Sequence, residues 1–305
     1  MRDKVLVTGA NGNLGKKFIL SKGDFDICAL VRSEKAKNDL MSFVQAKGIQ
    51  DVQIVKCDYL NVSLVKELAS SCSYVLHLVG IIKENKHNKF DLVHKQTTKA
   101  VVEAINGSDI KKTCYISILG SKVSSRNTCF SSRGLAEKLF IDSDIPSLIL
   151  QVPMVLGEGD YASKSLKKNA LSRFSFTFRK LSLEQPIYAG DIIEVIKLDI
   201  SRSLKGDLTQ SGIKALAGPT SLTREKLIKK AAKLLGVRVK VFSLPLFLGY
   251  GLARIFEILS SNPPISRSMM GVLDHDDAID PLHSCKELGI ELTVLDVMLE
   301  TTIIS

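Results

Sequence analysis

Three glycines at intervals of three residues, Gly9, Gly12 and Gly15, are the first candidates for chemistry in this sequence of 305 residues. They follow the apolar run Val5-Leu6-Val7, typical of a buried parallel strand, and lead into an amphipathic segment, 16–22. The first glycine permits a sharp turn, the second leaves room for a pyrophosphate, and the third lets a helix pack closely on the strand, with its N-terminus aimed at the phosphates. The pattern therefore predicts a dinucleotide-binding loop formed by Thr8, Gly9, Asn11, Gly12, Asn13, Leu14 and Gly15.

Arg32 and Ser33 stand where the second predicted strand, 27–31, ends. A site that prefers NAD places a carboxylate there to bond the ribose 2′-hydroxyl. An arginine instead can bond a 2′-phosphate through two N–H groups. Glu34 lies close enough to act as a competing carboxylate. We therefore expect Arg32 to bind a 2′-phosphate and NADP(H) to be preferred over NAD(H). The alternative is that Arg32 is an ordinary exposed cation at the end of the strand.

Alternating apolar strands and helices must position these residues. We expect strands at 4–8, 27–31, 52–56, 74–79, 113–117 and 147–152, and helices at 16–22, 38–47, 63–70, 90–106 and 134–142. Strands without polar alternation, separated by helices, are typical of a parallel sheet covered on both faces. The fold class is therefore α/β, a Rossmann-type doubly wound parallel sheet, with its ligand beyond the carboxyl ends of the strands.

The pattern loosens after residue 156. We expect a dinucleotide-binding domain at 1–156, completed by about 185–218, where Asp191 caps a helix through 202 and 214–217 adds a strand. Residues 157–184 and 219–305 form a smaller, mostly helical C-terminal lobe for a substrate or partner, with helices at 223–235, 246–259, 265–273 and 294–301. The apolar stretch 244–259 reads as a buried helix of this lobe, with a membrane-surface or partner-docking helix as the alternative.

Composition limits the partners. The net charge of +10 lies largely on helix faces that look solvated, and aromatic residues, at 6%, do not alternate with the charges, so no nucleic acid is expected. Six scattered cysteines without a CxxC pair indicate buried, reduced thiols, and no metal site is expected. The sequence has no transmembrane segment, and a first strand that begins by residue 4 leaves no signal peptide. We therefore expect a cytoplasmic protein, with peripheral association with a membrane as an alternative.

The sequence resembles the extended and atypical branch of the short-chain dehydrogenase/reductase superfamily, which carries TGxxGxxG, here Thr8 to Gly15. Similar stretches recur along nearly the whole chain, at 57–60, 77–80, 185–192 and 262–267. One similar subgroup contains the nucleotide-binding accessory subunit of respiratory complex I and bacterial proteins called NAD-dependent epimerases or dehydratases of sugar nucleotides. The resemblance implies that Asp58 touches adenine and that Thr97 and the turn Leu78-Val79-Gly80 line the cofactor.

The resemblance also implies a catalytic Tyr-x-x-x-Lys on the helix before the sixth strand. There the lysine lowers the pKa of the tyrosine, which exchanges a proton with the substrate. Here Cys129 stands in place of the tyrosine and Arg133 in place of the lysine. The serine of the family corresponds to Ser117, although strict spacing falls on Leu119. Arg133 could still hold the nicotinamide ribose, so Ser117, Cys129 and Arg133 form a degenerate catalytic set.

Three functions remain open from the sequence. The first is hydride transfer between NADP(H) and a carbonyl, an alcohol or a sugar nucleotide. The second is a nucleotide-binding subunit or assembly factor of a membrane-associated complex that has no catalytic role, and the third is an NADP(H)-dependent redox sensor. Two polar groups are expected at the surface instead of in a site: His94 with Glu84, and the loop Asp274-His275-Asp276-Asp277.

Overall fold

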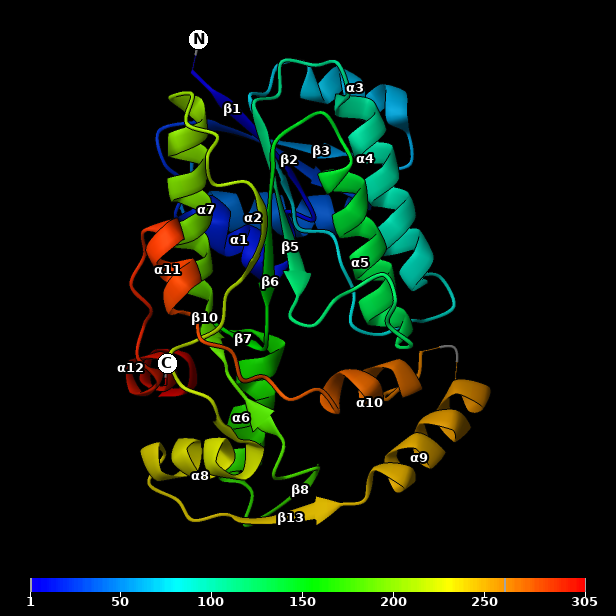
Figure 1. The fold of residues 1–305 in the computed structure, drawn as a ribbon, viewed down its shortest axis with the longest axis vertical. Coiled ribbons are helices and arrows are strands. Elements are labelled where there is room, and N and C mark those ends of the chain that lie inside the picture. Colours follow the sequence, from blue (N-terminus) through cyan, green and yellow to red (C-terminus); the bar gives the residue numbers. More distant parts are fainter. Residues whose placement is uncertain (1, 261, 305) are drawn as a thin grey trace.

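The centre of the molecule is a parallel sheet of seven strands, described here from a computed structural model that covers residues 2–260 and 262–304 (Figure 1). The strand order is β11-β6-β5-β4-β1-β2-β3. The strands are β1 (Lys4–Thr8), β2 (Asp26–Val31), β3 (Val52–Lys56), β4 (Tyr74–His77), β5 (Lys112–Ile118), β6 (Ser147–Val152) and β11 (Gly212–Ala215). The order runs outward from β1 in both directions, which is the doubly wound arrangement, so the predicted fold class is confirmed.

Helices cover both faces of the sheet (Figure 1). One face packs against α1 (Asn13–Leu20), α2 (Glu34–Ala46) and α7 (Ala189–Leu204), which contribute Phe18, Leu40 and Ile196 to one core cluster. The other face packs against α3 (Val62–Ala69), α4 (Thr97–Ile105) with the π-helical turn η1 (Asp91–Gln96) before it, and α5 (Thr128–Ile141). The apolar residues that the central strands β1, β2 and β4 present on both faces are buried, which explains why their sequences do not alternate.

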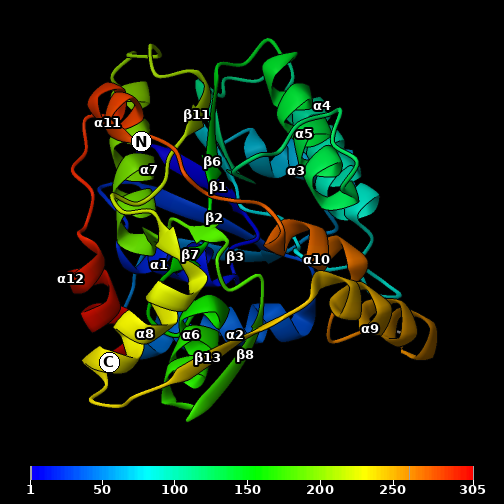
Figure 2. The same ribbon diagram turned by 60° about the horizontal axis from the view of Figure 1, so that its bottom comes forward.

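Most of the remaining elements gather below the carboxyl ends of the strands, while α11 lies beside α7 (Figures 1 and 2). They comprise α6 (Tyr161–Leu171), α8 (Arg224–Leu234), α9 (Leu246–Leu259), α10 (Arg267–Leu273), α11 (Leu282–Leu288), α12 (Leu295–Leu299) and η2 (Glu300–Ile304). Three short ribbons accompany them: β7 (Val155–Leu156) with β10 (Ile187–Tyr188), β9 (Leu183–Glu184) with β12 (Leu222–Thr223), and β8 (Phe174–Phe178) with β13 (Lys240–Leu244). None of the helices in the described residues combines the length and the apolar character that crossing a bilayer requires.

Helix boundaries differ from the sequence expectations where side chains cap the ends. α2 begins at Glu34 because the Ser33 hydroxyl accepts the Ala36 N–H, and α5 begins at Thr128 because the Asn127 side chain accepts the Cys129 and Phe130 N–H groups. Asp191 was expected to cap α7, but it lies in the first turn of that helix. Its carboxylate accepts the backbone N–H of Thr293 at 3.0 Å and thereby holds the C-terminal segment.

The expectation of a buried helix at 246–259 is wrong. Only Gly249 and Ala253 of α9 are buried, whereas Phe247, Ile258 and Leu259 are 71%, 76% and 77% exposed. The side of α9 that carries Gly249 and Ala253 packs toward α10, and the large apolar side chains of the helix are left exposed.

A charged pair is buried on the sheet, where β5 meets α7. Lys112, which is fully buried, donates to Asp199 at 2.7 Å and to the Gln210 carbonyl at 2.6 Å. The Tyr74 hydroxyl donates to the second oxygen of Asp199. Burial raises the pKa of Asp199, and the ammonium of Lys112 opposes that rise. Every member of this network has a partner, which is the condition under which a buried ion pair is tolerated.

Candidate functional site: a crevice at the carboxyl ends of the strands

The turn after β1 is shaped by backbone geometry that only glycine provides. Gly9 has φ of 70°, a left-handed conformation, and its N–H donates to the Tyr59 hydroxyl at 3.0 Å. That hydroxyl donates in turn to the Leu30 carbonyl at 2.9 Å. A side chain on Gly15 would place its Cβ 2.5 Å from the Ala10 carbonyl oxygen. The first and third glycines therefore let the chain turn and let α1 approach β1.

This turn forms one wall of a crevice of about 690 Å³ at the edge where the strands end. The opposite wall is the segment after β4, and the far end is closed by the segments that follow β2 and β3. The predicted residues in its lining are Gly9, Asn11, Gly12, Arg32, Asp58, Leu78, Val79 and Gly80. The structure thus brings together side chains and backbone from four separate strand ends.

The start of α1, which follows Gly12 of the crevice lining, has backbone N–H groups without an acceptor in the helix. The first N–H of α1 to bond within the helix is that of Lys16, to the Gly12 carbonyl, so the N–H groups of Asn13, Leu14 and Gly15 have no intrahelical acceptor. The Asn11 Oδ1 atom is buried without a hydrogen-bond partner among the described residues. An anion is stabilised by such N–H groups and by the helix dipole.

Arg32 is exposed and lines the crevice directly after β2. Its Nη1 donates to Asn88 Oδ1 at 3.0 Å, across the opening. Glu34, the competing carboxylate, pairs with Lys56 at 2.8 Å. Ser33 uses its hydroxyl to cap α2, which occupies one lone pair of that oxygen.

Three further predicted cofactor residues have local partners. Asp58 accepts the Leu60 N–H at 3.1 Å and lines the crevice. Thr8 is buried and bonds the His77 Nδ1 atom at 2.8 Å. Thr97 is also buried, and its hydroxyl donates to the Val93 carbonyl of its own helix, whereas Val93 itself lines the crevice.

Two histidines lie buried beneath the crevice. His94 is fully buried, so the expectation of a solvated surface pair with Glu84 is wrong; Glu84 instead accepts the Phe90 N–H at 2.8 Å. Burial, with the nearby Arg133 cation, lowers the pKa of His94 to about 2 and that of His77 to about 3. Both rings are therefore neutral at physiological pH.

A neutral His94 with its hydrogen on Nδ1 can bond both the Ser132 hydroxyl and the Ile81 N–H, although Nε2 also lies 3.1 Å from the Ile81 carbonyl oxygen. Nδ1 then donates to the Ser132 hydroxyl at 2.8 Å, which donates to the Cys129 carbonyl at 2.9 Å. The Ile81 N–H donates to Nε2 at 3.0 Å. His94 thus ties the segment after β4 to α5, and it is a positioning residue for this wall of the crevice.

The residues at the two catalytic positions of α5 face the same segment. Cys129 is fully buried with its thiol 3.9 Å from the Ile81 carbonyl, and burial raises the pKa of this thiol to about 11. Arg133 donates from Nη1 to the Tyr115 hydroxyl at 3.0 Å and to the Ile116 carbonyl at 2.8 Å. A Cβ on Gly80 would overlap the Arg133 guanidinium, so this side chain occupies the space above Gly80.

Ser117 lies apart from Cys129 and Arg133. Its hydroxyl donates to Glu137, a buried carboxylate that also accepts from Gln151 Nε2 at 3.0 and 2.9 Å. Burial raises the pKa of Glu137. Ser117 therefore belongs to a network between α5, β5 and β6, while Leu119, the alternative position, is buried.

The start of α5 is covered by α10. The Asn127 side chain donates to the Ser268 carbonyl at 3.0 Å, and the hydroxyls of Thr128 and Ser268 lie 2.9 Å apart. Two cavities flank this contact. One, of about 830 Å³, is lined by Lys86, Lys89, Arg126 and Arg267 among others, and one of about 460 Å³ lies by Gly120 and His275.

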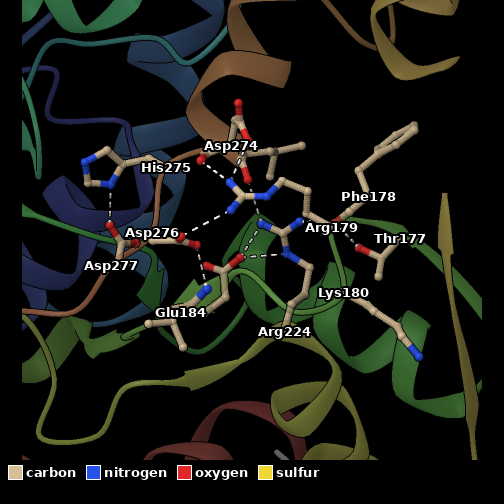
Figure 3. A network of polar contacts seen from close by, with 12 residues as sticks. Thr177, Phe178, Arg179, Lys180, Glu184, Arg224, Asp274, His275, Asp276 and Asp277 are labelled. Atoms are coloured by element: carbon tan, nitrogen blue, oxygen red, sulfur yellow. Dashed lines mark hydrogen bonds and ion pairs between the residues drawn. The ribbon is translucent and has the colours of Figure 1, made fainter. Parts of the chain in front are cut away.

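The loop 274–277 was expected to be freely solvated, but ion pairs hold it in place (Figure 3). Arg179 pairs with Asp274 at 2.5 Å and with Asp276 at 3.2 Å, and His275 Nδ1 lies 3.0 Å from Asp277. Arg224 donates to Glu184 at 2.7 Å and to the Leu273 carbonyl at 3.1 Å. In the described part of the chain, no group of three histidine, cysteine or acidic side chains is placed to hold a metal ion.

The sequence did not indicate the hydrogen-bonding roles of Tyr59, His77 and Glu137, and it did not indicate that His94 is buried. Their roles depend on contacts between residues 20 or more apart in the sequence, with the exception of His94 and Ile81. A sequence signal existed only for His77, which lies at the end of an apolar strand pattern.

Comparison with known proteins supports this assignment of the fold. No family model matches the chain. The sequence is 18% identical over 297 residues to mouse NADH dehydrogenase [ubiquinone] 1 alpha subcomplex subunit 9, mitochondrial, a match that spans 95% of this chain and 77% of that protein.

Solved structures resemble the whole chain. The Bordetella bronchiseptica enzyme WbmG in complex with NAD superposes with a TM-score of 0.70 at 13% identity, covering 100% of this chain and 94% of that one. UDP-glucuronic acid 4-epimerase from Bacillus cereus, in complex with UDP-glucuronic acid and NAD, superposes with a TM-score of 0.70 at 19% identity over 98% of each chain. These similarities confirm the resemblance that the sequence predicted to the extended short-chain dehydrogenase/reductase fold and to the complex I subunit.

Proposed function

We propose that the protein binds a pyridine dinucleotide in the crevice and retains it as a structural ligand, without tyrosine-dependent hydride transfer. The observation that carries this proposal is the placement of Arg133, whose guanidinium is buried against Gly80 and bonded to Tyr115 and Ile116. Bonded in this way, the guanidinium is committed to Tyr115 and Ile116, and burial of the Cys129 thiol outweighs the tendency of the Arg133 charge to lower its pKa.

The other catalytic positions support the same proposal. The Cys129 thiol is protonated at physiological pH because burial raises its pKa to about 11, so it is a poor proton donor or acceptor there. The Ser117 hydroxyl is bonded to Glu137. When bound, the dinucleotide would supply hydride chemistry, but Ser117, Cys129 and Arg133 are each bonded or buried in a way that opposes a role as its acid or base.

A subunit role follows from the relative that matches along most of its length. The printed name of that relative describes a subunit of NADH dehydrogenase, and we propose that the present chain likewise serves as a nucleotide-binding subunit or assembly factor of a larger complex. The division into a dinucleotide-binding domain, 1–156 with 185–218, and a partner lobe is part of this proposal.

This proposal is tested by measuring both the binding of NADPH and its oxidation by candidate substrates. Purified protein is titrated with NADPH, followed by the fluorescence of the reduced nicotinamide, which no tryptophan of the chain obscures, and then mixed with a panel of aldehydes, ketones and sugar nucleotides. We expect saturable binding and NADPH oxidation no faster than in buffer. Turnover at about 1 s⁻¹ or more, the lower end of typical enzymes, would overturn the structural role. Absence of binding would overturn the site itself.

NADP(H) preference is the finer part of the proposal, and Arg32 supports it. We expect NADPH to bind about tenfold more tightly than NADH, because a charge-assisted bidentate contact to phosphate contributes about 1.5–3 kcal/mol. Arg32→Ala should remove most of that difference and leave NADH affinity nearly unchanged. Lys35→Ala, which removes an exposed cation on the adjoining helix, is the matched control. Equal affinities of the two cofactors for the unaltered protein would contradict the preference.

A further inference from the structure

β8, β13 and α9 follow one another along the lower edge of the molecule (Figure 1), and together they carry nine exposed large apolar side chains. In the parallel pair β8–β13, Phe176 lies opposite Phe242, and their rings stack with centroids 5.4 Å apart. Phe174 lies 6.0 Å from the same ring. These three rings are 43–61% exposed, whereas Val241 and Ser175, on the other face of the ribbon, are buried.

The outer side of α9 extends this surface. Its members are Phe247, Leu248, Leu252, Ile255, Ile258 and Leu259, each between 45% and 77% exposed. Their spacing of three, four and seven residues places them on one side of the helix. β13 runs into α9 through Pro245, and Phe178 of β8 lies beside Gly249 on the inner side of α9. We call the three phenylalanines and these six residues the apolar strip.

The segments that build the strip are unusually basic. Residues 161–183 and 226–259 contain thirteen lysines and arginines and a single acidic residue, Glu257, which pairs with Arg267. The whole chain has 42 basic and 32 acidic residues, so the remainder holds 29 and 31. The net charge of +10 therefore originates in the two segments that form the strip and its supports.

Several of these cations stand beside the exposed rings. Lys240 is exposed and shares the outer face of β13 with Phe242, two residues away. The Arg173 guanidinium lies 5.5 Å from the centre of the Phe174 ring, and Arg254 is exposed at the edge of the outer side of α9. Within the described residues, none of the three forms an ion pair with a carboxylate of its own chain.

We propose that the apolar strip is a peripheral docking surface for an anionic lipid bilayer. Large apolar side chains flanked by lysine and arginine, on elements too short to span, are the features that place a helix in the interface of an anionic membrane. A water-soluble surface seldom leaves so many large apolar side chains together without a ligand. The excess of thirteen cations over one carboxylate in these segments favours anionic lipid over a second copy of this chain, whose strip would present the same positive charge.

The test is cosedimentation of the full chain with phosphatidylcholine vesicles, with and without phosphatidylglycerol. We expect binding to the anionic vesicles, at least about tenfold weaker binding to the neutral ones, and loss of most binding when salt is raised from about 0.1 M to about 1 M, where the Debye length falls from about 10 to about 3 Å. Binding that is equal for both lipids and indifferent to salt would overturn the proposal.

Substitutions in and outside the apolar strip test whether this surface binds the vesicles. Ile258→Ser with Leu259→Ser should weaken vesicle binding about tenfold or more, because each change removes apolar groups that would enter the interface. Leu282→Ser with Val294→Ser, at positions 72% and 57% exposed outside the strip, is the matched control and should bind like the unaltered chain. Lys240→Gln with Arg254→Gln should weaken binding to anionic vesicles alone, and Lys35→Gln with Lys99→Gln should not.

The proposal does not depend on the dinucleotide. NADPH affinity, measured in parallel, should be the same for all of these variants, so failure at the strip and failure at the crevice give different results. Sedimentation velocity tests the competing occupant, a second copy of the chain. If the chain forms a concentration-dependent dimer that the double substitution of Ile258 and Leu259 abolishes, while no vesicle binds, the lipid proposal is wrong.

Discussion

Gly12→Val is expected to weaken dinucleotide binding by about a hundredfold or more, equivalent to about 2.7 kcal/mol, while the protein stays folded. Gly12 has φ of −68° and ψ of 165°, an extended conformation that valine adopts readily. The atom nearest to an added Cβ is the Gly9 carbonyl oxygen at 3.2 Å, so the new side chain meets little of the protein itself. It projects instead from the turn where the diphosphate would lie, at the N–H groups that begin α1.

The measurement is a fluorescence titration with NADPH, beside thermal unfolding followed by circular dichroism. Gly12→Ala should have a smaller effect in the same direction, since a methyl group fills less of the crevice. Gly251→Val is the matched control, because a Cβ there would meet no atom within 4 Å and the position lies on α9. Affinity of Gly12→Val within about threefold of the unaltered protein, less than about 0.7 kcal/mol, would refute the assignment of the turn.

Lys112→Met is expected to lower the free energy of unfolding by about 3–5 kcal/mol, because it leaves Asp199 buried without its cation. Lys112 is fully buried and Asp199 is 2% exposed, so water cannot replace the lost contact. The second substitution Asp199→Asn, which removes the stranded charge and keeps an acceptor for Tyr74, should restore part of the loss. Lys138→Met breaks the exposed pair with Asp142 and should cost less than about 0.5 kcal/mol.

The loss in Lys112→Met should also depend on pH. Burial already raises the pKa of Asp199, and removal of the ammonium that opposes this rise should raise it further. The folded variant then binds a proton that the unfolded chain releases above its pKa of about 3.9. Stability is therefore lost as pH rises through the folded pKa, so urea unfolding should show a smaller deficit near pH 4 than near pH 7. A deficit that is constant with pH would show that Asp199 is not the stranded charge.

The fold was predictable because its strongest signals are local. The run Val5-Leu6-Val7 with glycines at 9, 12 and 15 specifies a strand, a turn and a helix within about ten residues, and the order of elements through 152 follows from apolar strands separated by amphipathic helices. The sequence also identified eight of the sixteen residues that line the crevice, since the carboxyl ends of parallel strands meet at one edge. Helix starts were displaced where a single side chain, Ser33 or Asn127, makes the cap.

The state of the candidate catalytic residues was not predictable in the same way. That Arg133 bonds Tyr115 and Ile116 depends on the packing of α5 against β5, and the thiol of Cys129 faces the Ile81 carbonyl of the segment after β4, far away in the sequence. The sequence predicted that the apolar side of α9 is buried, with a docking surface as the alternative. The structure leaves that side exposed, because only Gly249 and Ala253 of this helix are buried.

The hydroxyl of Tyr59 joins the ends of three neighbouring strands before any nucleotide arrives, because it accepts from Gly9, donates to Leu30 and belongs to the segment after β3. A binding turn that is already ordered loses little conformational freedom when its ligand enters, and less of the contact energy is consumed in ordering it. Tyr59 can thus strengthen nucleotide binding through preorganisation alone, from a position where its own hydrogen bonds are made entirely within the protein.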